Sequence, residues 1–142
     1  MFAKKKLHKL NIDYKHEFML IGIASHENDY RLSWALNNEL NFNFTKVNDF
    51  ILNHPKHKVE IPYSTYYSDE YLDLDCYLIS NKSEMGFLLP KMTNIDFILK
   101  IPQDIEGDIV EQLLFKLKRV EIIITAFVID NIPDKTLKIF EF

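Results

Sequence analysis

Glycine is scarce in this chain, with Gly22, Gly86 and Gly107 as the only three, and they lie far apart. Phosphate-cradling loops of the dinucleotide-binding and P-loop types need closely spaced glycines, because the backbone must approach the phosphates and adopt conformations closed to other residues. The sequence therefore excludes nucleotide binding or hydrolysis by those two routes.

Cysteine and long apolar runs are also lacking. The single cysteine, Cys76, excludes an internal disulfide and fits a reducing compartment, and its place at an apolar position predicts a buried, inert thiol. No run approaches the ~20 apolar residues of a membrane span, and the basic opening MFAKKKLHK leads into polar residues rather than a signal core. We expect a cytoplasmic protein with no membrane association.

Charge is unevenly distributed along the chain, although the formal net charge is only −4. Residues 1–16 hold five lysines (Lys4, Lys5, Lys6, Lys9 and Lys15) against one acidic residue, which leaves 12 basic and 20 acidic residues in the rest. An acidic body repels phosphate backbones, so RNA or a ribonucleoprotein would have to bind through the basic N-terminal arm, residues 1–9. A solvated tail is the alternative interpretation of that arm.

The length of 142 residues and the hydrophobic fraction of 47% predict one globular domain over residues 1–142. Its C-terminal part is patterned as strand, helix, strand. Apolar residues alternate over 95–101, which predicts a strand with one face in a core, and they recur at three and four over 107–119, which predicts an amphipathic helix. Residues 120–129 are apolar at both parities, which predicts a central strand covered on both faces.

The N-terminal part is patterned in a similar way. We expect extended segments over 9–14 and 17–25, then a helix over 28–40 that is N-capped by Asn28 or Asp29. Residues 58–80 predict an inserted β-hairpin with a Ser-Asp-Glu turn, in which Pro62 marks an outer strand or a bulge. The pairing expected across it sets Val59, Ile61, Tyr63 and Tyr67 against Leu72, Leu74, Cys76 and Leu78.

These elements predict an α+β fold in which a mostly antiparallel sheet carries two helices on one face. The most economical topology is a ferredoxin-like or ACT-like sandwich with the hairpin as an insertion.

No catalytic or metal-binding motif outweighs a structural interpretation of the same residues. Asp73 and Asp75 fall on one face of an expected strand, but the glycine and spacing of a calcium loop are missing. The five histidines include the pair in HPKH, yet no second cysteine or acidic pair completes a zinc site. Ser25, His26 and Glu27 are adjacent in sequence, whereas a catalytic triad assembles in space. We predict no metal, no cofactor, no catalytic residue and no small-molecule ligand.

The helix over 28–40 carries large rings on the face opposite its core stripe. With 100° per residue, Leu32, Ala35, Leu36 and Leu40 form that stripe. Rings, an arginine and amides on one face are typical of interface anchors. The face comprises Tyr30, Arg31, Trp34, Asn37 and Asn38. Two interpretations stay open: a partner protein binds this face, or the hairpin folds over it and buries both rings.

The segment LLPKMTNIDFILKI resembles the signature of the IPExxxVDY family, a bacterial family of the Bacteroidota. The positions that carry the resemblance are Leu89, Pro90 and Lys91, a spacer of three residues, and then Ile95, Asp96 and Phe97. The family is also similar at LIGIASHENDYRLSWALN and at YLISNK. The resemblance implies a bacterial cytoplasmic protein and no assigned activity, cofactor or substrate.

Lys91 stands where the family signature has a glutamate, so any role of that carboxylate does not transfer to this chain. Asp96 stands where the signature loop leads into the strand, on the face opposite Phe97. We expect it either to pair with Arg31 or to cap a loop.

The leading hypothesis is a non-enzymatic interaction or regulatory module that binds another protein through the outer face of helix 29–40. The alternatives are an RNA- or ribonucleoprotein-associated protein that docks through the basic arm, and an enzyme whose pocket the sequence does not reveal. The last of these would place a concave polar site near Asp96 or His26.

If the basic arm binds RNA, replacing Lys4, Lys5, Lys6 and Lys9 by Ser abolishes the binding and leaves the melting temperature unchanged, because a solvated arm adds nothing to the core. About four neutralised phosphates give a log–log salt slope of roughly −3 on a single strand. A filter-binding titration measures the loss of binding and the salt slope. It covers about 0.05 to 0.3 M salt, because phosphate contacts are lost over that range. Binding by the variant that equals that of the parent protein excludes the arm.

Overall fold

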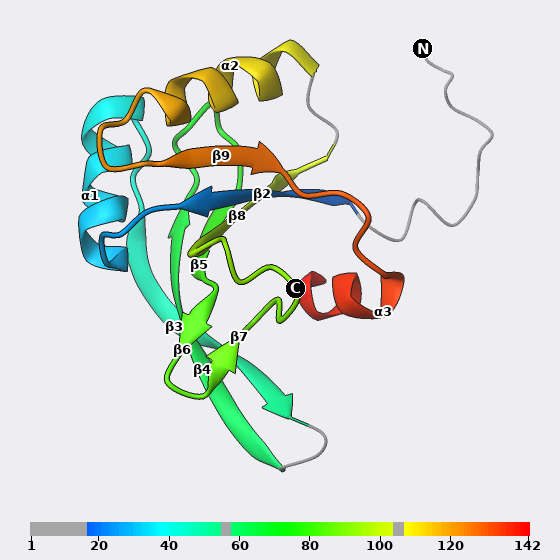
Figure 1. Ribbon diagram of the computed structural model, residues 1–142. Coiled ribbons are helices and arrows are strands. Elements are labelled where there is room, and N and C mark those ends of the chain that lie inside the picture. The colour runs from blue at the N-terminus through cyan, green and yellow to red at the C-terminus, as the bar shows by residue number, and fades with distance from the viewer. Residues whose placement is uncertain (1–16, 55–57, 104–106) are drawn as a thin grey trace, which may run out of the picture.

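The computed structural model describes residues 17–54, 58–103 and 107–142, and over these the protein has an α+β fold (Figure 1). Six strands form an antiparallel sheet, as the predicted fold class requires, and three short helices pack around it. The strands of the main sheet are β2 (Phe18–Ala24), β3 (Thr45–His54), β4 (Val59–Ser68), β5 (Cys76–Ser80), β8 (Phe97–Pro102) and β9 (Thr125–Val128). The helices are α1 (Asp29–Leu40), α2 (Gly107–Lys118) and α3 (Asp134–Leu137), which continues into a 3-10 turn over Lys138–Phe140. A small ribbon pairs β6 (Lys82–Ser83) with β7 (Gly86–Phe87).

The strand order is β3-β4-β5-β8-β2-β9, and every neighbouring pair is antiparallel. The four strands β9-β2-β8-β5, with α1 and α2 in their crossovers, are consistent with a ferredoxin-like sandwich to which β3 and β4 are added. β2 and β8 lie inside the sheet, where they pair over six residues from Phe18↔Pro102 to Ile23↔Phe97.

Helices α1 and α2 cover one face of this sheet, as the sequence predicted, and their apolar stripes fill the larger core. Asn28 caps α1, because its side chain accepts a hydrogen bond from the Arg31 backbone N–H at 2.8 Å. The helix ends at Asn41, which adopts the left-handed conformation with φ 66°. The buried helical residues are Leu32, Ala35, Leu36 and Leu40 from α1 and Leu113 and Leu117 from α2.

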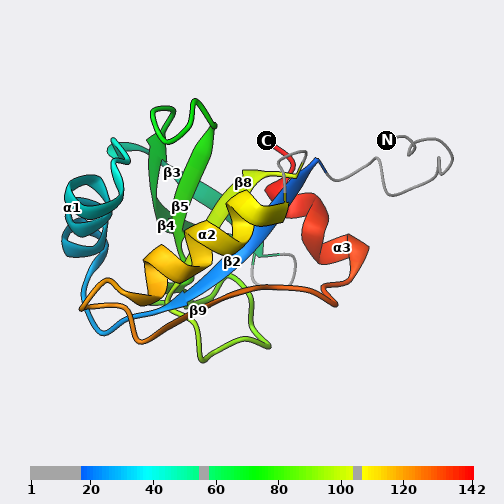
Figure 2. The ribbon, with the colours of Figure 1, turned by 90° about the horizontal axis from the view of Figure 1, so that it is seen from above.

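The opposite face of the sheet carries a second core that the sequence did not predict. It is closed by the loop before β8 and by the C-terminal segment with α3, which lies at the other end of the molecule from α1 in Figure 2. Phe140, which is completely buried, anchors the C-terminal segment, and Leu88, Leu89 and Ile95 anchor the loop. As a consequence β8 is buried on both faces, whereas one buried face was expected from its alternation.

The expectation of a central strand over 120–129 is wrong. Only Thr125–Val128 forms a strand, and β9 lies at an edge of the sheet, where it pairs with β2 alone. Val120 and Ile123 are apolar because they lie in tight turns after α2 and pack under the helices. Ile124 is 59% exposed, so the apolar run includes residues of the connection before β9 and one side chain that faces solvent.

The hairpin expected over 58–80 corresponds to β4 and β5, but its details differ. These strands pair only through residues 65–68 and 76–79, and a seven-residue connection replaces the Ser-Asp-Glu turn. Leu72 and Asp73 lie in that connection with positive φ, so the pairings proposed for Leu72 and Leu74 and the strand face proposed for Asp73 and Asp75 are wrong. Cys76 and Leu78 pair with Ser68 and Tyr66, which are not the partners expected for them.

Strand β3 was missed because Lys46, Asn48, Asp49 and Asn53 interrupt its apolar pattern. It is the outer strand, has an irregularity between Val47 and Phe50, and pairs with β4 over most of its length. β4 is therefore not outermost, although over Pro62 its register joins it only to β3. Pro62 therefore needs a donor for one neighbouring strand at most, as is usual for proline in a sheet.

No helix among the described residues is long and apolar enough to cross a membrane. The extended segment expected over 9–14 and the basic arm over 1–9 lie outside the described residues.

Gly22 allows the loop before β8 to lie against β2. A methyl group at this position would stand 3.0 Å from Ile95 Cγ2 and 3.2 Å from Ile129 Cδ1. Ile95 cannot withdraw easily, since its carbonyl accepts a hydrogen bond from the buried Asn81 side chain at 2.9 Å. Gly22→Ala is therefore expected to lower the free energy of unfolding by about 1–3 kcal/mol, the usual cost of overpacking a core. Urea denaturation measures it, and a Gly22→Ala/Ile95→Ala double variant that shows no coupling contradicts the explanation.

Candidate functional site

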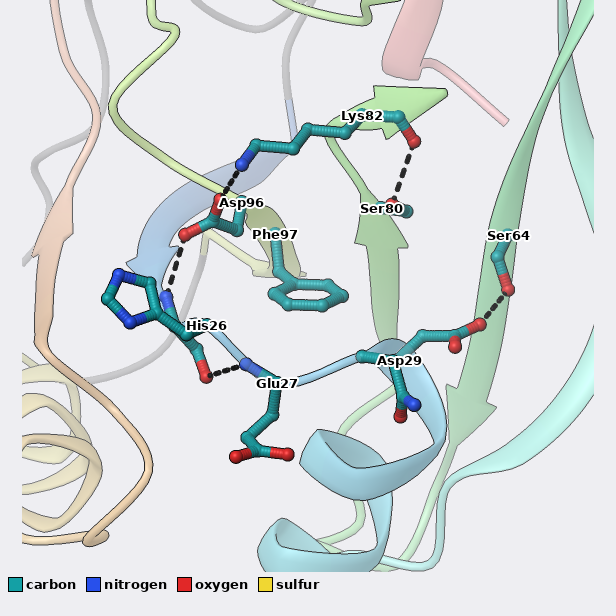
Figure 3. Close-up of a pocket in the computed structure, with 10 residues that line it drawn as sticks. His26, Glu27, Asp29, Ser64, Ser80, Lys82, Asp96 and Phe97 are labelled. Atoms are coloured by element: carbon teal, nitrogen blue, oxygen red, sulfur yellow. Dashed lines mark hydrogen bonds and ion pairs between the residues drawn. The ribbon is translucent and has the colours of Figure 1, made fainter. Parts of the chain in front are cut away.

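A polar cleft of about 480 Å³ lies where β2 ends and α1 begins (Figure 3). This volume is within the range of small-molecule sites, which is roughly 300–1,000 Å³. Charged and polar side chains from four segments of the chain line it, and the buried Phe97 ring lies among them. The lining residues are Ser25, His26, Glu27, Asn28, Asp29, Ser64, Ser80, Lys82, Asp96 and Phe97.

Asp96, the acidic residue of the family-like signature, joins two segments at this cleft. One carboxylate oxygen accepts a hydrogen bond from the Ser25 backbone N–H at 2.8 Å, and the other forms an ion pair with Lys82 (Figure 3). Asp96 therefore caps the loop between β2 and α1, which is one of the two roles expected for it. Arg31 does not reach it, and its Nε lies 3.8 Å from Glu27 instead.

The rest of the signature is structural, because three of its apolar members are buried and the remaining two residues face solvent. Leu89, Ile95 and Phe97 are buried, whereas Pro90 and Lys91 are exposed. The completely buried Asn81 fastens this loop: its side-chain amide donates to the carbonyls of Met92 and Ile95, and its oxygen accepts from the Leu89 N–H at 2.8 Å.

The acidic groups on the α1 side of the cleft are likewise engaged within the fold. Asp29 accepts hydrogen bonds from the Ser64 hydroxyl and from the Tyr30 backbone N–H at 2.8 Å. The Ser25 hydroxyl donates to the Ile122 carbonyl at 2.6 Å and accepts from the Glu27 N–H at 3.2 Å. These bonds hold the turn before α1 and connect it with β4 and with the chain after α2.

The chemistry available in this cleft follows from those bonds. Asp96, Asp29 and Ser25 have partners in the fold, and His26, although exposed beside them, makes no hydrogen bond to them. Among residues 17–54, 58–103 and 107–142, no group of three or more His, Cys, Asp or Glu side chains is arranged to hold a metal ion. The Ser25-His26-Glu27 sequence does not form a triad here, because the Ser25 hydroxyl donates to a backbone carbonyl.

Other candidates from the sequence are placed away from the cleft. Cys76 is completely buried in the helix-side core, and burial raises the pKa of its thiol to about 12, so it is not a nucleophile at neutral pH. Of the HPKH segment, residues 55–57 lie outside the described residues.

The outer face of α1 adjoins the cleft and carries exposed rings. Tyr30 is 66% exposed and Trp34 is 57% exposed, one helical turn apart. The β4–β5 hairpin does not lie over these rings, so the interpretation in which it buries them is wrong. The reason is topological, because β4 and β5 extend the sheet sideways and pair within it.

The amides of this face have different roles. Asn37 is half-buried and bonds the backbone of Phe44 in both directions, accepting from its N–H at 2.7 Å and donating to its carbonyl at 3.1 Å. Asn37 therefore anchors the chain between α1 and β3 and is not free to meet a partner. Asn38 is exposed, and its amide donates to the Trp34 carbonyl at 2.9 Å. The surface that remains, which we call the α1 face, comprises Tyr30, Arg31, Trp34 and Asn38.

Sequence reasoning did not single out Ser64, Asn81 or Lys82, and it considered Ser25 only as a neighbour of His26 and Glu27. Each acts through a contact with a residue distant in sequence, and serine, asparagine and lysine carry no local pattern that marks such a contact. A usable signal was the polar Asn81 directly after the apolar run of β5, since a buried amide at such a position needs several partners.

Comparisons of the chain with protein-family models, with curated proteins and with solved structures found no match.

Replacing Asp96 by Ala is expected to lower the free energy of unfolding by about 1–3 kcal/mol, because the buried Ser25 N–H loses its acceptor. The matched variant Lys82→Met removes the other partner, whose side chain is 53% exposed, and is expected to cost less than about 1 kcal/mol. Chemical denaturation of the two variants separates the contributions. Equal losses would show that the ion pair, and not the loop cap, is what Asp96 supplies.

Proposed function

We propose that the protein is a non-enzymatic, cytoplasmic interaction or regulatory module that binds a partner protein through the α1 face. The observation that carries the proposal is the exposure of Tyr30 and Trp34 on adjacent turns of one helix. Large aromatic side chains are the residues that most often supply binding energy at protein interfaces. Here they stand opposite the core stripe of α1 and are not needed for its packing.

The helix that presents the rings is held rigidly in the fold. Asn28 caps its first turn, Asn41 closes its last, and Asn37 ties it to the chain before β3. A surface that is already ordered loses little conformational entropy when a partner binds. The α1 face therefore has the preorganisation that an interface anchor requires.

Charge indicates the chemistry of the partner. Outside residues 1–16 the chain holds 12 basic and 20 acidic residues, so an acidic partner is repelled over a long range. Tyrosine and tryptophan rings attract lysine and arginine side chains over their faces. We therefore assign to the α1 face a protein segment that carries exposed Lys or Arg.

The polar cleft supports a second, weaker candidate. It is a concave polar site next to Asp96 and His26, where an unrecognised enzyme would have its pocket. The engagement of Asp96, Asp29 and Ser25 within the fold favours a structural role for the cleft over a catalytic one. RNA binding through the arm is supported by the charge difference alone, and membership of the IPExxxVDY family by the signature residues alone.

The test compares two helices of the same protein. A photo-crosslinking residue is placed at Asn38 on the α1 face or at Phe115 on α2, which is 62% exposed and serves as the control position. A protein that crosslinks to position 38 and not to position 115 is purified as the partner. Its affinity for the unmodified protein is then measured by calorimetry. Tyr30→Ala/Trp34→Ala is expected to weaken binding at least about tenfold, since two interface anchors contribute more than about 1.4 kcal/mol together.

Phe115→Ala is expected to leave the affinity unchanged, and neither variant should alter the melting temperature, because all three rings are exposed. Binding is also expected to weaken with added salt, as an acidic protein and a basic segment require. A partner whose affinity survives the double substitution, or whose crosslinked segment lacks Lys and Arg, contradicts the proposal. Trp34 is the single tryptophan, so its fluorescence reports directly on occupation of the face.

A further inference from the structure

Lys100 is the most deeply buried charged residue among the described residues, and the module function does not use it. It lies in the central strand β8, and only 7% of its surface is exposed. Its side chain points to the face of the sheet that the C-terminal segment covers, and its Nζ donates to the main-chain oxygen of Phe142 at 3.0 Å. No aspartate or glutamate side chain within the described ranges forms an ion pair with it.

Aromatic rings surround this amine. Nζ lies 3.7 Å from the ring centroid of Phe142, 5.1 Å from that of Phe18 and 5.3 Å from that of Tyr77. Rings attract the ammonium form, but they replace water poorly, and burial lowers the pKa of Lys100 to about 8. Near neutral pH a larger share of this amine is uncharged and nucleophilic than for a lysine in water.

The amine also has an entrance. Lys100 lines a cleft of about 280 Å³ together with the aromatic side chains of Phe18, Tyr67, Tyr77 and Phe142. Phe142 is 54% exposed, so this side of the cleft faces solvent and not the core. A lysine that lines an aromatic cleft differs from a lysine that is sealed inside a core.

We propose that Lys100 is a covalent binding site for small, uncharged aromatic aldehydes or ketones, which it holds as an imine. The neutral amine adds to the carbonyl carbon, a C–N bond forms, and a proton passes from nitrogen to oxygen to give a carbinolamine. Loss of one water molecule then gives the imine, with no net oxidation or reduction. The aromatic body of the ligand would stack against Tyr77 and Phe142.

Charge in the cleft restricts the ligand further. Glu17 and Asp75 line it, and Asp75 accepts a hydrogen bond from the Tyr67 hydroxyl at 2.5 Å. These carboxylates disfavour a carbonyl compound that carries its own carboxylate. The titratable groups that line the cleft with Lys100 are thus Glu17, Tyr67, Asp75 and Tyr77.

The test is reductive trapping of the folded protein. The protein is treated with benzaldehyde and sodium cyanoborohydride, and the modified lysines are identified by peptide mass spectrometry. At pH 8 about half of an amine with the pKa of Lys100 is neutral, against about 0.4% for a lysine in water. Allowing for restricted access, we expect Lys100 to react at least roughly tenfold faster than Lys82, an exposed lysine paired with a carboxylate.

Three controls test the role of the amine, of the ligand charge and of the carboxylates in the cleft. Lys100→Met is expected to remove the fast adduct, and 4-carboxybenzaldehyde is expected to react several-fold more slowly than benzaldehyde at Lys100 alone. Glu17→Gln/Asp75→Asn is expected to reduce that difference. An unmodified Lys100 in protein whose circular dichroism is native, or labelling of Lys100 no faster than that of Lys82, overturns the proposal.

Discussion

The two-sided burial of β2 and β8 is the constraint on which the rest of the structure depends. These neighbouring strands lie inside the sheet, and Ile21, Ile23, Ile98 and Leu99 are completely buried. A sheet with apolar side chains on both faces requires two covers. Helices α1 and α2 cover one face, while the loop before β8 and the C-terminal segment cover the other.

The helical cover has an outer side that the core does not use, and the exposed rings lie there. The other cover is assembled from irregular chain, so polar groups must secure it. Asn81 satisfies three backbone groups of the loop, and Asp96 joins the end of that loop to the start of α1. The same loop packs on Gly22, where a larger residue would separate it from β2.

Burial on the second face also accounts for the unusual environment of Lys100. Its place in β8 directs it under the C-terminal segment, where rings and a main-chain oxygen are its neighbours. Burial of a charged amine without an aspartate or glutamate partner costs free energy, which a methionine at this position would not incur. Such a residue is a functional candidate for that reason, and its distance in sequence from the α1 face allows the two surfaces to be tested separately.

The sequence by itself determined the α+β class, the helices of residues 29–40 and 107–118, and the strands of residues 18–24 and 97–102. Periodicity and capping are local, so a stretch of ten residues contains the information. The tertiary structure alone decided that Thr125–Val128 lies at an edge and that β3 joins the sheet. It likewise determined that Asp96 accepts a hydrogen bond from the Ser25 N–H and does not pair with Arg31. It also decided that Tyr30 and Trp34 face solvent and that Lys100 is buried among rings. Apolarity predicts that a side chain will be buried, but strand order and the path of the covering chain decide which residues bury it. Both depend on contacts between residues far apart in the sequence.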